Sequence, residues 1–476
     1  MADQLSSLTV IFSEFYYWIA VVLMFLTQVG FSMHRSGASR WKNHHHSLLT
    51  TAVLIPILTL SFFLYGWWIY FAVPAGPGIA ELFGGDGVLL PSPWAEPWSE
   101  LMSAHLGGIP TDTENLSLGD TLFWSRTNGV LWAVFLLFSW TVVAIVAGAV
   151  IERIRPSAFY LLAIVVGSFC WIVAASWGWQ WNGWMVAFLG YHDAYAAGVV
   201  HATAGGFALG ILVHLGPRLA RFRADGTPRS LRPISPWLST VGLFFIYVGL
   251  WGFYIASNVP ILDVGPTAGM EQSFWTSTNI YFAPTTLSAM TFNFILALTG
   301  GLTAAYVVSK GDAFWTYSGG LAGLVATSAG NDLYHPLQAL LIGAAAAILA
   351  YKLHHWVERR FRIDDGVGAV AVHGYAGVFG VIAAGFMLWG YPSSMSVGYA
   401  HITPWGQLAG AAICFLLLGF LPAWIVAGIL KYLGVLRIPA AIEIAGLDFA
   451  INNANREAAE EMAAFEQDLA AKIGGR

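Results

Sequence analysis

Charge is scarce in this chain. Only 10% of its 476 residues are Asp, Glu, Lys or Arg, whereas 57% are hydrophobic, and the mean hydropathy is +0.66. A soluble domain carries about 25% charged residues. The composition therefore excludes a string of soluble domains and predicts an all-α polytopic membrane protein surrounded by the lipid bilayer.

Cysteine is also scarce, and the sequence has no basic run typical of a nucleic-acid surface. Cys170 and Cys414 fall in apolar segments without a ligand pattern, which indicates small buried side chains rather than redox or metal groups. The histidines at 44–46 and 354–355 lie among basic residues, where solvated loops explain them better than metal binding. We expect no enzyme, cofactor, metal or nucleic-acid partner, because a haem or copper oxidase needs several ligands in one cluster.

Long apolar runs dominate instead. A membrane span needs about 20 mainly apolar residues, and eleven segments qualify: roughly 9–33, 48–73, 128–150, 157–178, 194–215, 237–258, 283–308, 315–330, 336–353, 367–390 and 406–432. With the N-terminus outside, 20 of the 21 Lys and Arg residues lie in or beside the expected inside segments, and Arg126 is the exception. Because Lys and Arg favour the cytoplasmic side, we predict an N-out/C-in multi-pass protein of the cell (inner) membrane.

The spans divide into two sets of five and a terminal helix. The sets cover about 9–215 and 237–390, and an odd number of spans in each forces opposite orientations, so the repeats are inverted. We therefore expect a transmembrane domain over 1–433 and a cytoplasmic tail over 434–476. The tail is predicted to contain an amphipathic helix, since four apolar residues share one helical face: Met462, Phe465, Leu469 and Ile473.

One motif occurs in both repeats. The pattern D-x7-H-x-x-A-G-x-F begins at Asp193, with His201, and again at Asp365, with His373. An ionisable side chain deep in an apolar span is costly and therefore a functional candidate, and inverted repeats bring such sites together near the midplane. We predict that His201 and His373 meet there. The two aspartates lie at span entrances, where helix N-capping is a sufficient explanation.

Further short motifs follow one another in order along nearly the whole chain. They are Gly30-Phe31…Gly37 with Lys42-Asn43, Glu152-Arg153-Ile154-Arg155, Val200-His201…Ala204-Gly205, His214-Leu215-Gly216-Pro217-Arg218, Asp364-Asp365…Val372-His373-Gly374, Leu436-Arg437-Ile438-Pro439 and Gly446-Leu447-Asp448. This ordered set resembles the ammonium transporter (Amt/Rh) family. The resemblance implies a homotrimer with a pore in each subunit that transports ammonium or ammonia.

The resemblance also implies roles for individual residues. His201 and His373 match the pore histidines, which contact each other and relay or orient a proton, and imidazole suits this role because it both donates and accepts. Phe138 and Phe253 match the two phenylalanines of the outer gate. An apolar pore of this kind rejects an unpaired ion, because burying a charge costs many kcal/mol.

An external site for the substrate is implied as well. Trp181, Phe138 and Ser257 match the residues that recruit NH4+, and Asp193 matches a buried structural aspartate near them. Aromatic rings attract a cation by about 0.5–2 kcal/mol, and a serine hydroxyl can accept one of its hydrogen bonds.

Some positions depart from the family pattern. Val134 stands where a further aromatic ring is usual, Tyr254 stands for an asparagine, and the tail reads Asn452-Asn453-Ala454 instead of His-Gly-Glu. Two alternatives therefore stay open: an ammonium sensor or receptor with little flux, and a transporter of a larger, methylated amine. The altered tail also disfavours a PII-type signal protein, the family's regulatory partner.

Overall fold

The computed structural model describes residues 2–73, 118–180, 183–260, 277–281, 283–394, 398–451 and 464. The predicted amphipathic tail helix and Trp181 lie outside these residues. Within them, ten helical stretches are long and apolar enough to cross a bilayer. The predicted span 315–330 is the shorter helix α11, Ala313–Thr327. The all-helical polytopic membrane fold is thus confirmed.

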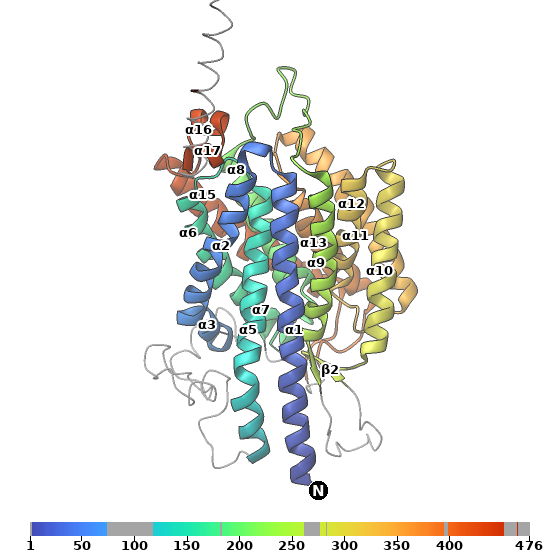
Figure 1. The fold of residues 1–476 in the computed structure, drawn as a ribbon. Helices are drawn as coiled ribbons and strands as arrows, with labels where there is room; N and C mark the ends of the chain where they lie inside the picture. Colours follow the sequence, from blue (N-terminus) through green and yellow to red (C-terminus); the bar gives the residue numbers. More distant parts are fainter. Residues whose placement is uncertain are drawn as a thin grey trace, which may run out of the picture.

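The first half of the bundle contains several spans that change between α-helix and π-helix along their length, and Figure 1 shows how its helices are arranged. Its elements are α1 Ala2–Ala38, η1 Trp41–Asn43, α2 His44–Ser61, η2 Phe62–Gly66, α3 Trp67–Ala72, α5 Leu118–Ala149, α6 Pro156–Val165, η5 Val166–Cys170, α7 Trp171–Gly178, η6 Met185–Leu189, η7 Ala197–Ala202 and α8 Thr203–Leu215. Here α2, η2 and α3 form one span, as do α6, η5 and α7.

The second half is built in the same way. Its elements are α9 Pro236–Ala256, α10 Leu287–Val308, α11 Ala313–Thr327, α12 Pro336–Phe361, η8 Val370–Tyr375, α13 Ala376–Met387, α14 Pro404–Ala412, η9 Ile413–Phe420, α15 Leu421–Tyr432, α16 Ala440–Ala445 and α17 Leu447–Ile451. The connection between α9 and α10, expected to be a loop, also contains a small antiparallel sheet of order β1-β2-β3, made of Asn258–Pro260, Ser277–Asn279 and Pro284–Thr285.

Glycines let the helices approach closely where the two halves meet. Helix α1 lies beside α9 (Figure 1), and a Cβ on Gly30 would come within 2.6 Å of the Gly242 carbonyl oxygen. A Cβ on Gly205 of α8 would come within 2.2 Å of the Gly374 Cα in η8. Small residues permit such backbone contact in lipid, where dispersion replaces the hydrophobic effect as the driving force between helices.

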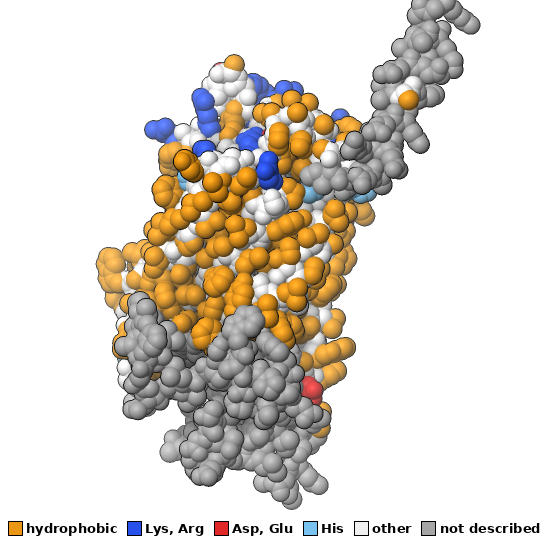
Figure 2. All heavy atoms as spheres, turned by 90° about the vertical axis from the view of Figure 1, so that its left-hand side faces the viewer, with side chains coloured by type: hydrophobic (Ala, Val, Ile, Leu, Met, Phe, Trp, Pro, Cys, Tyr) orange, Lys and Arg blue, Asp and Glu red, His pale blue; other side chains and the backbone are white. Residues whose placement is uncertain are grey.

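One end of the bundle is rich in positive charge. Lys and Arg side chains gather at the end that carries α16 and α17, and a broad hydrophobic belt lies below them (Figure 2). We call this end, which includes Arg40, Arg153, Arg218, Arg221 and Arg437, the basic end. The positive-inside rule predicts that it faces the cytoplasm.

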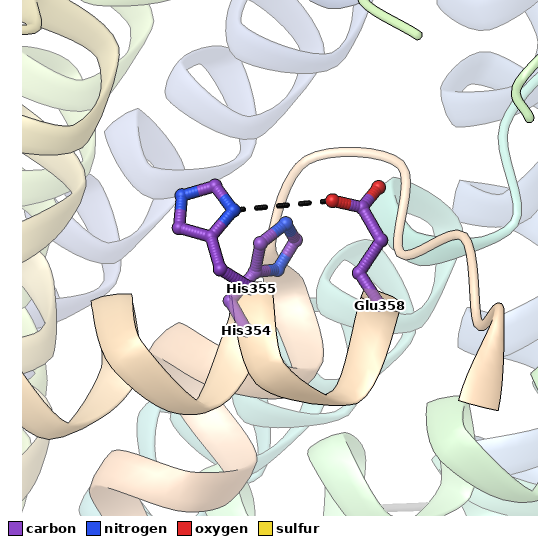
Figure 3. A group of neighbouring side chains, drawn as sticks. All are labelled: His354, His355 and Glu358. Carbon is purple, nitrogen blue, oxygen red and sulfur yellow. Dashed lines mark ion pairs between the residues drawn. The ribbon is translucent and has the colours of Figure 1, made fainter. Parts of the chain in front are cut away.

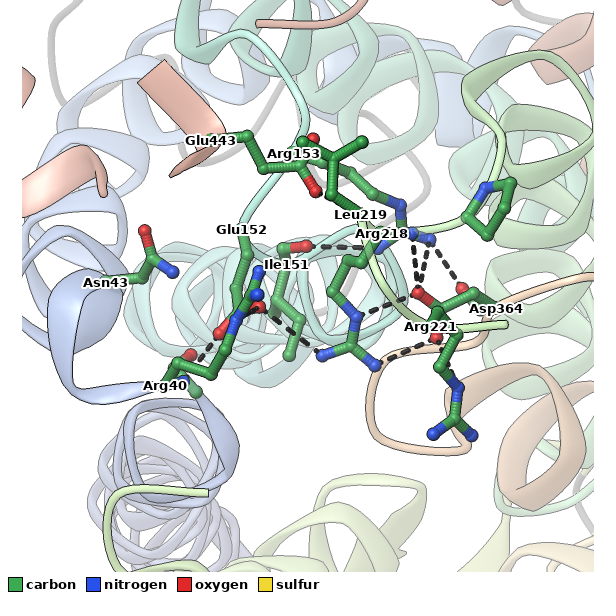
Figure 4. Close-up of polar contacts among 12 residues, drawn as sticks. Arg40, Asn43, Ile151, Glu152, Arg153, Arg218, Leu219, Arg221, Asp364 and Glu443 are labelled. Atoms are coloured by element: carbon green, nitrogen blue, oxygen red, sulfur yellow. Dashed lines mark hydrogen bonds and ion pairs between the residues drawn. The ribbon is translucent and has the colours of Figure 1, made fainter. Parts of the chain in front are cut away.

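A buried charge network joins the two halves at the basic end (Figure 4). Glu152, after α5, binds Arg40 at 2.7 Å and Arg218 at 3.7 Å. Asp364, after α12, binds Arg218 at 2.8 Å and Arg153 at 3.9 Å. Burial opposes ionisation of Asp364, but the two guanidinium groups hold its pKa far below the usual range.

Candidate functional site

The two predicted histidines are in direct contact at the centre of the bundle. The Nδ1 atoms of His201 on η7 and His373 on η8 lie 3.1 Å apart, with ring centroids 5.0 Å apart and ring planes 30° apart. Their exposed fractions are 1% and 3%. One Nδ1 must donate and the other accept, so the pair shares one hydrogen at this contact. The close approach of Gly205 to Gly374 brings the rings together.

The helices around each histidine are held by the paired aspartates. The Asp193 Oδ2 accepts from the backbone N–H groups of Gly198 and Val199 at 2.8 and 2.9 Å. Asp365 accepts from the N–H groups of Ala369 and Val370 at 2.9 and 2.8 Å. Each carboxylate therefore satisfies free donors at the start of a π-helical turn. This geometry gives both aspartates a structural role.

The predicted gate residues pack against each other toward the opposite end from the basic residues. The rings of Phe138 on α5 and Phe253 on α9 have centroids 4.5 Å apart and an interplanar angle of 82°, and both are buried. The Ser257 hydroxyl, one helical turn after Phe253, donates to the Phe253 carbonyl at 3.0 Å. Its oxygen lone pairs stay available to accept a hydrogen bond.

Other aromatic rings surround Phe138: Trp179, which the sequence offered only as another register for Trp181, and Trp171 and Phe135, which sequence reasoning missed. The centroids of Trp179, Trp171 and Phe135 lie 4.8, 6.0 and 6.2 Å from that of Phe138. Phe135 precedes Phe138 by three residues, so helical spacing could have identified it. The two tryptophans come from a different span, and nothing in the local sequence signals their approach. The site is thus richer in aromatic rings than Val134 alone suggested.

Tyr254 packs toward α11. Its hydroxyl contacts the Ser328 hydroxyl at 3.1 Å, and its ring stacks on Tyr195 with centroids 4.2 Å apart. The hydroxyl also donates to the Leu324 carbonyl at 3.3 Å, so this tyrosine joins α9 to α11. At this position, where the family pattern has asparagine, the side chain thus takes part in helix packing.

A small cavity lies next to the histidine pair on the side of the basic end. Its volume is about 20 Å³, and Phe31, His34, Arg35 and His373 are among the residues that line it. The centroids of the Phe31 and His373 rings are 5.9 Å apart. A space of this size accommodates about one water molecule.

The histidines expected in solvated loops lie in helices, so that interpretation was wrong. His46 is buried near the start of α2, and the backbone N–H groups of His45 and His46 donate to Asp448 at 3.1 and 2.6 Å. These contacts attach the tail segment to the first half. The local sequence did not reveal this arrangement because the capping residue, Asp448, lies far from α2 in sequence.

His354 and His355 lie on α12 rather than in a loop. With Glu358 they point into one small region (Figure 3), and their ligand atoms all lie within 4.8 Å of one another. The Glu358 carboxylate, however, already pairs with Arg221. A neighbouring guanidinium disfavours a second cation at the same carboxylate, so we assign no metal to this cluster.

Comparison with known proteins agrees with this architecture. The profile of the Ammonium Transporter Family matches residues 15–456. Ammonium transporter Amt2 of Archaeoglobus fulgidus is 28% identical over 475 residues, covering 95% of this chain and 90% of the relative. Ammonium transporter Amt2 of Methanocaldococcus jannaschii is 28% identical over 439 residues, covering 92% and 89%.

Solved structures show the same fold. A structure described as a sensor Amt protein superposes with a TM-score of 0.71 at 22% identity, covering 94% of this chain and 99% of that chain. The crystal structure of Saccharomyces cerevisiae Mep2 gives a TM-score of 0.62 at 19% identity, covering 90% and 88%. Because the family profile spans most of the sequence, the chain belongs to the ammonium transporter family of multi-pass cell-membrane transporters, which are not enzymes.

Proposed function

We propose that this protein transports ammonium by binding NH4+ at an external aromatic site and passing neutral NH3 through the twin-histidine path. The observation that carries the proposal is the direct contact of His201 with His373, two imidazoles in an apolar interior. A buried ionisable pair at a repeat interface is the expected position of a transport path.

Recruitment is assigned to the end opposite the basic residues. Phe138, Ser257 and Trp181 are the proposed ligands, and Trp179 adds a ring whose centroid lies 4.8 Å from that of Phe138. Each ring face attracts a partly desolvated cation by about 0.5–2 kcal/mol. The Phe138–Phe253 pair then acts as a gate, since a ring must turn for a molecule to pass between centroids 4.5 Å apart.

The histidines handle the proton. Moving NH4+ through the apolar interior costs many kcal/mol, whereas NH3 crosses without an unpaired charge. The Nδ1–Nδ1 contact supports transfer of one hydrogen between the rings, and the His201 Nε2 has no partner among the described residues, so it is free to bond a passing molecule. A histidine pair is suited to such transfer because each ring both donates and accepts.

Assembly as a homotrimer belongs to the same proposal. Helix α1 exposes a row of large apolar side chains at a spacing of three or four residues: Phe15, Trp18, Val22, Phe25 and Val29. Such a row meets either lipid or a neighbouring subunit. Light scattering of the detergent-solubilised protein would show three chains if the proposal holds and one if it does not. Pull-down with a PII-type protein tests that partner, which the altered tail disfavours.

The decisive experiment measures current from purified protein in proteoliposomes on a solid-supported membrane. Pulses of ammonium and then of methylammonium are compared for wild type and the double variant His201→Ala/His373→Ala. We expect an ammonium current that the variant loses or alters. A current only with methylammonium would assign the larger amine as substrate and keep the path.

A sensor with little flux is the second candidate. The tail attachment favours it, because Asp448 bonds the start of α2 and the Leu447 N–H donates to Asn43 Oδ1 at 2.9 Å. A change in the bundle could thereby reach the tail. Folded protein that binds ammonium but carries no current with any amine would contradict transport and support the sensor.

A further inference from the structure

A buried arginine lies just beyond the histidine pair, toward the basic end. Arg35 of α1 is only 5% exposed. Its guanidinium donates to two neutral acceptors on α2, the Ser47 carbonyl and, at 2.6 Å, the Thr51 hydroxyl. Its Nε has no hydrogen-bond partner among the described residues. The buried positive charge of Arg35 therefore lacks a bonded carboxylate in the described part of the chain.

Arg35 also borders three of the small internal cavities. Their volumes are about 20, 30 and 20 Å³. The first is also lined by His373, so the guanidinium and one pore histidine face the same space. Each cavity accommodates about one or two water molecules. The guanidinium thus borders three separate narrow spaces rather than bulk solvent.

The cavity shared with His373 lies on the inner side of the histidine pair. Helix α5 carries Phe138 at the gate and Gly148 at this cavity, and α9 carries Phe253 at the gate and Leu243 at the cavity. On each helix the gate residue and the cavity residue are ten positions apart in sequence. Ten residues span about 15 Å along a helix. A molecule that passes the gate and the histidines therefore meets Arg35 before it reaches the basic end.

The groups around Arg35 do not offset its charge. His34 Nδ1 lies 3.0 Å from the Ser239 carbonyl, and its ring stacks on Phe314. Glu152 lines one of the cavities, but its carboxylate binds Arg40 at 2.7 Å and Arg218 at 3.7 Å. His46, Tyr160 and His373 are the other titratable neighbours, and none of them supplies a negative charge near neutral pH.

We infer that Arg35 sets the charge selectivity of the inner half of the path. Its positive charge rejects ammonium, potassium and other monovalent cations, so that nitrogen leaves the histidine pair toward the basic end only as neutral ammonia. A unit charge within roughly 8 Å disfavours a cation by about 30-fold at an effective dielectric constant near 20. The inference rests on the proposed transport function and adds the residue that excludes charge.

The alternative is a purely structural role, in which Arg35 fastens α1 to α2 through Ser47 and Thr51. Two kinds of variant separate the roles. Arg35→Gln removes the charge, whereas Arg35→Lys keeps it and loses the planar fork of donors. Thr51→Glu leaves Arg35 in place and supplies a carboxylate beside it, with Thr51→Gln as the neutral control of similar size.

The test measures two quantities on the same proteoliposomes after each variant has been shown to melt cooperatively. The ammonium current and the potassium current are both read on the solid-supported membrane. We expect Arg35→Gln and Thr51→Glu to raise the ratio of potassium current to ammonium current by at least about tenfold. Arg35→Lys and Thr51→Gln should keep the wild-type ratio. An unchanged ratio in both Arg35→Gln and Thr51→Glu would overturn the inference.

Failure of the transport proposal gives a different result. Wild-type protein would then move no ammonia above the level of empty liposomes. A potassium current that appears only in Arg35→Gln and Thr51→Glu would still identify Arg35 as the residue that excludes cations. Absence of flux in the wild type and all four variants would overturn both proposals.

Discussion

The two repeats share their histidine and capping aspartate but differ in the residue just before the aspartate. In the first repeat this residue is His192, whose Nε2 lies 3.0 Å from Asp332 Oδ2. In the second it is Asp364, which binds Arg218 and Arg153. Both pairs are buried, but the residue before the capping aspartate is the cation of its pair in the first repeat and the anion in the second. The two repeats thus hold their histidines in the same way, whereas the charge beside each capping aspartate differs.

Because of this difference, the stability that each buried pair contributes changes with pH in opposite directions. Burial opposes protonation of His192, but Asp332 raises its pKa above the usual value. Its stabilisation is therefore complete below an unfolded pKa of about 6.5 and is lost as the pH rises through the folded pKa. The pKa of Asp364 is depressed, so its stabilisation is present above about pH 4 and is lost as the pH falls.

The largest expected effect on stability comes from removing the negative charge of Asp364 in the second repeat. Asp364→Asn leaves Arg218 and Arg153 buried without their carboxylate, which should lower the free energy of unfolding by roughly 3–5 kcal/mol. The melting temperature in detergent measures the loss, and it should also become less sensitive to acid. Asp225→Asn, at an exposed loop carboxylate, is the control and should change little. Equal melting temperatures for the two variants would contradict the structural role of Asp364.

The corresponding change in the first repeat is His192→Gln. We expect a loss of roughly 2–4 kcal/mol near pH 6, because Asp332 is then buried without a cation. The loss should shrink as the pH rises, since His192 in the wild type becomes neutral. Melting curves from pH 5.5 to 9 measure this trend. A loss that grows with pH would show that His192 is not the protonated partner.

A smaller effect is expected at the contact that joins the repeats. Gly205→Ala would place a Cβ 2.2 Å from the Gly374 Cα, forcing the helices apart at a cost of about 1–3 kcal/mol. The histidine contact should lengthen and the ammonium current should fall. Gly129→Ala on α5 is the matched control, because a Cβ there meets nothing within 4 Å. An unchanged current in a folded Gly205→Ala protein would argue against a strict need for the Nδ1–Nδ1 contact.

The smallest effect is expected at Asp365, the capping aspartate of the second repeat. Burial, aided by the charge of Asp364, raises the pKa of Asp365 to about 7. A folded pKa above the unfolded value of about 3.9 means that stability decreases as the pH rises from about 4 to 7. Asp365→Asn should remove this slope while costing about 1 kcal/mol through the weakened cap. Melting temperatures between pH 5 and 7.5 test this, and an unaltered slope would contradict it.

Much of the architecture could be predicted from the sequence. In a bilayer every backbone polar group must be bonded within the chain, so long apolar runs must form helices. His201 and His373 could be identified because ionisable residues are costly in such runs and these two recur at matching positions. The tail contact of Asp448 and the helical position of His354 could not be found, since each depends on a partner far away in sequence.

The sequence by itself determined the spans, the paired histidines and the duplicated aspartates, because hydropathy and a repeated motif are properties of the chain alone. Only the tertiary structure decided which rings surround Phe138, where Trp171 and Trp179 arrive from another span. It also decided that Arg35, which in sequence is an ordinary basic residue near the end of a span, is buried and lines the same cavity as His373. The direction in which a helical side chain points, to lipid, solvent or interior, depends on which helices pack around it.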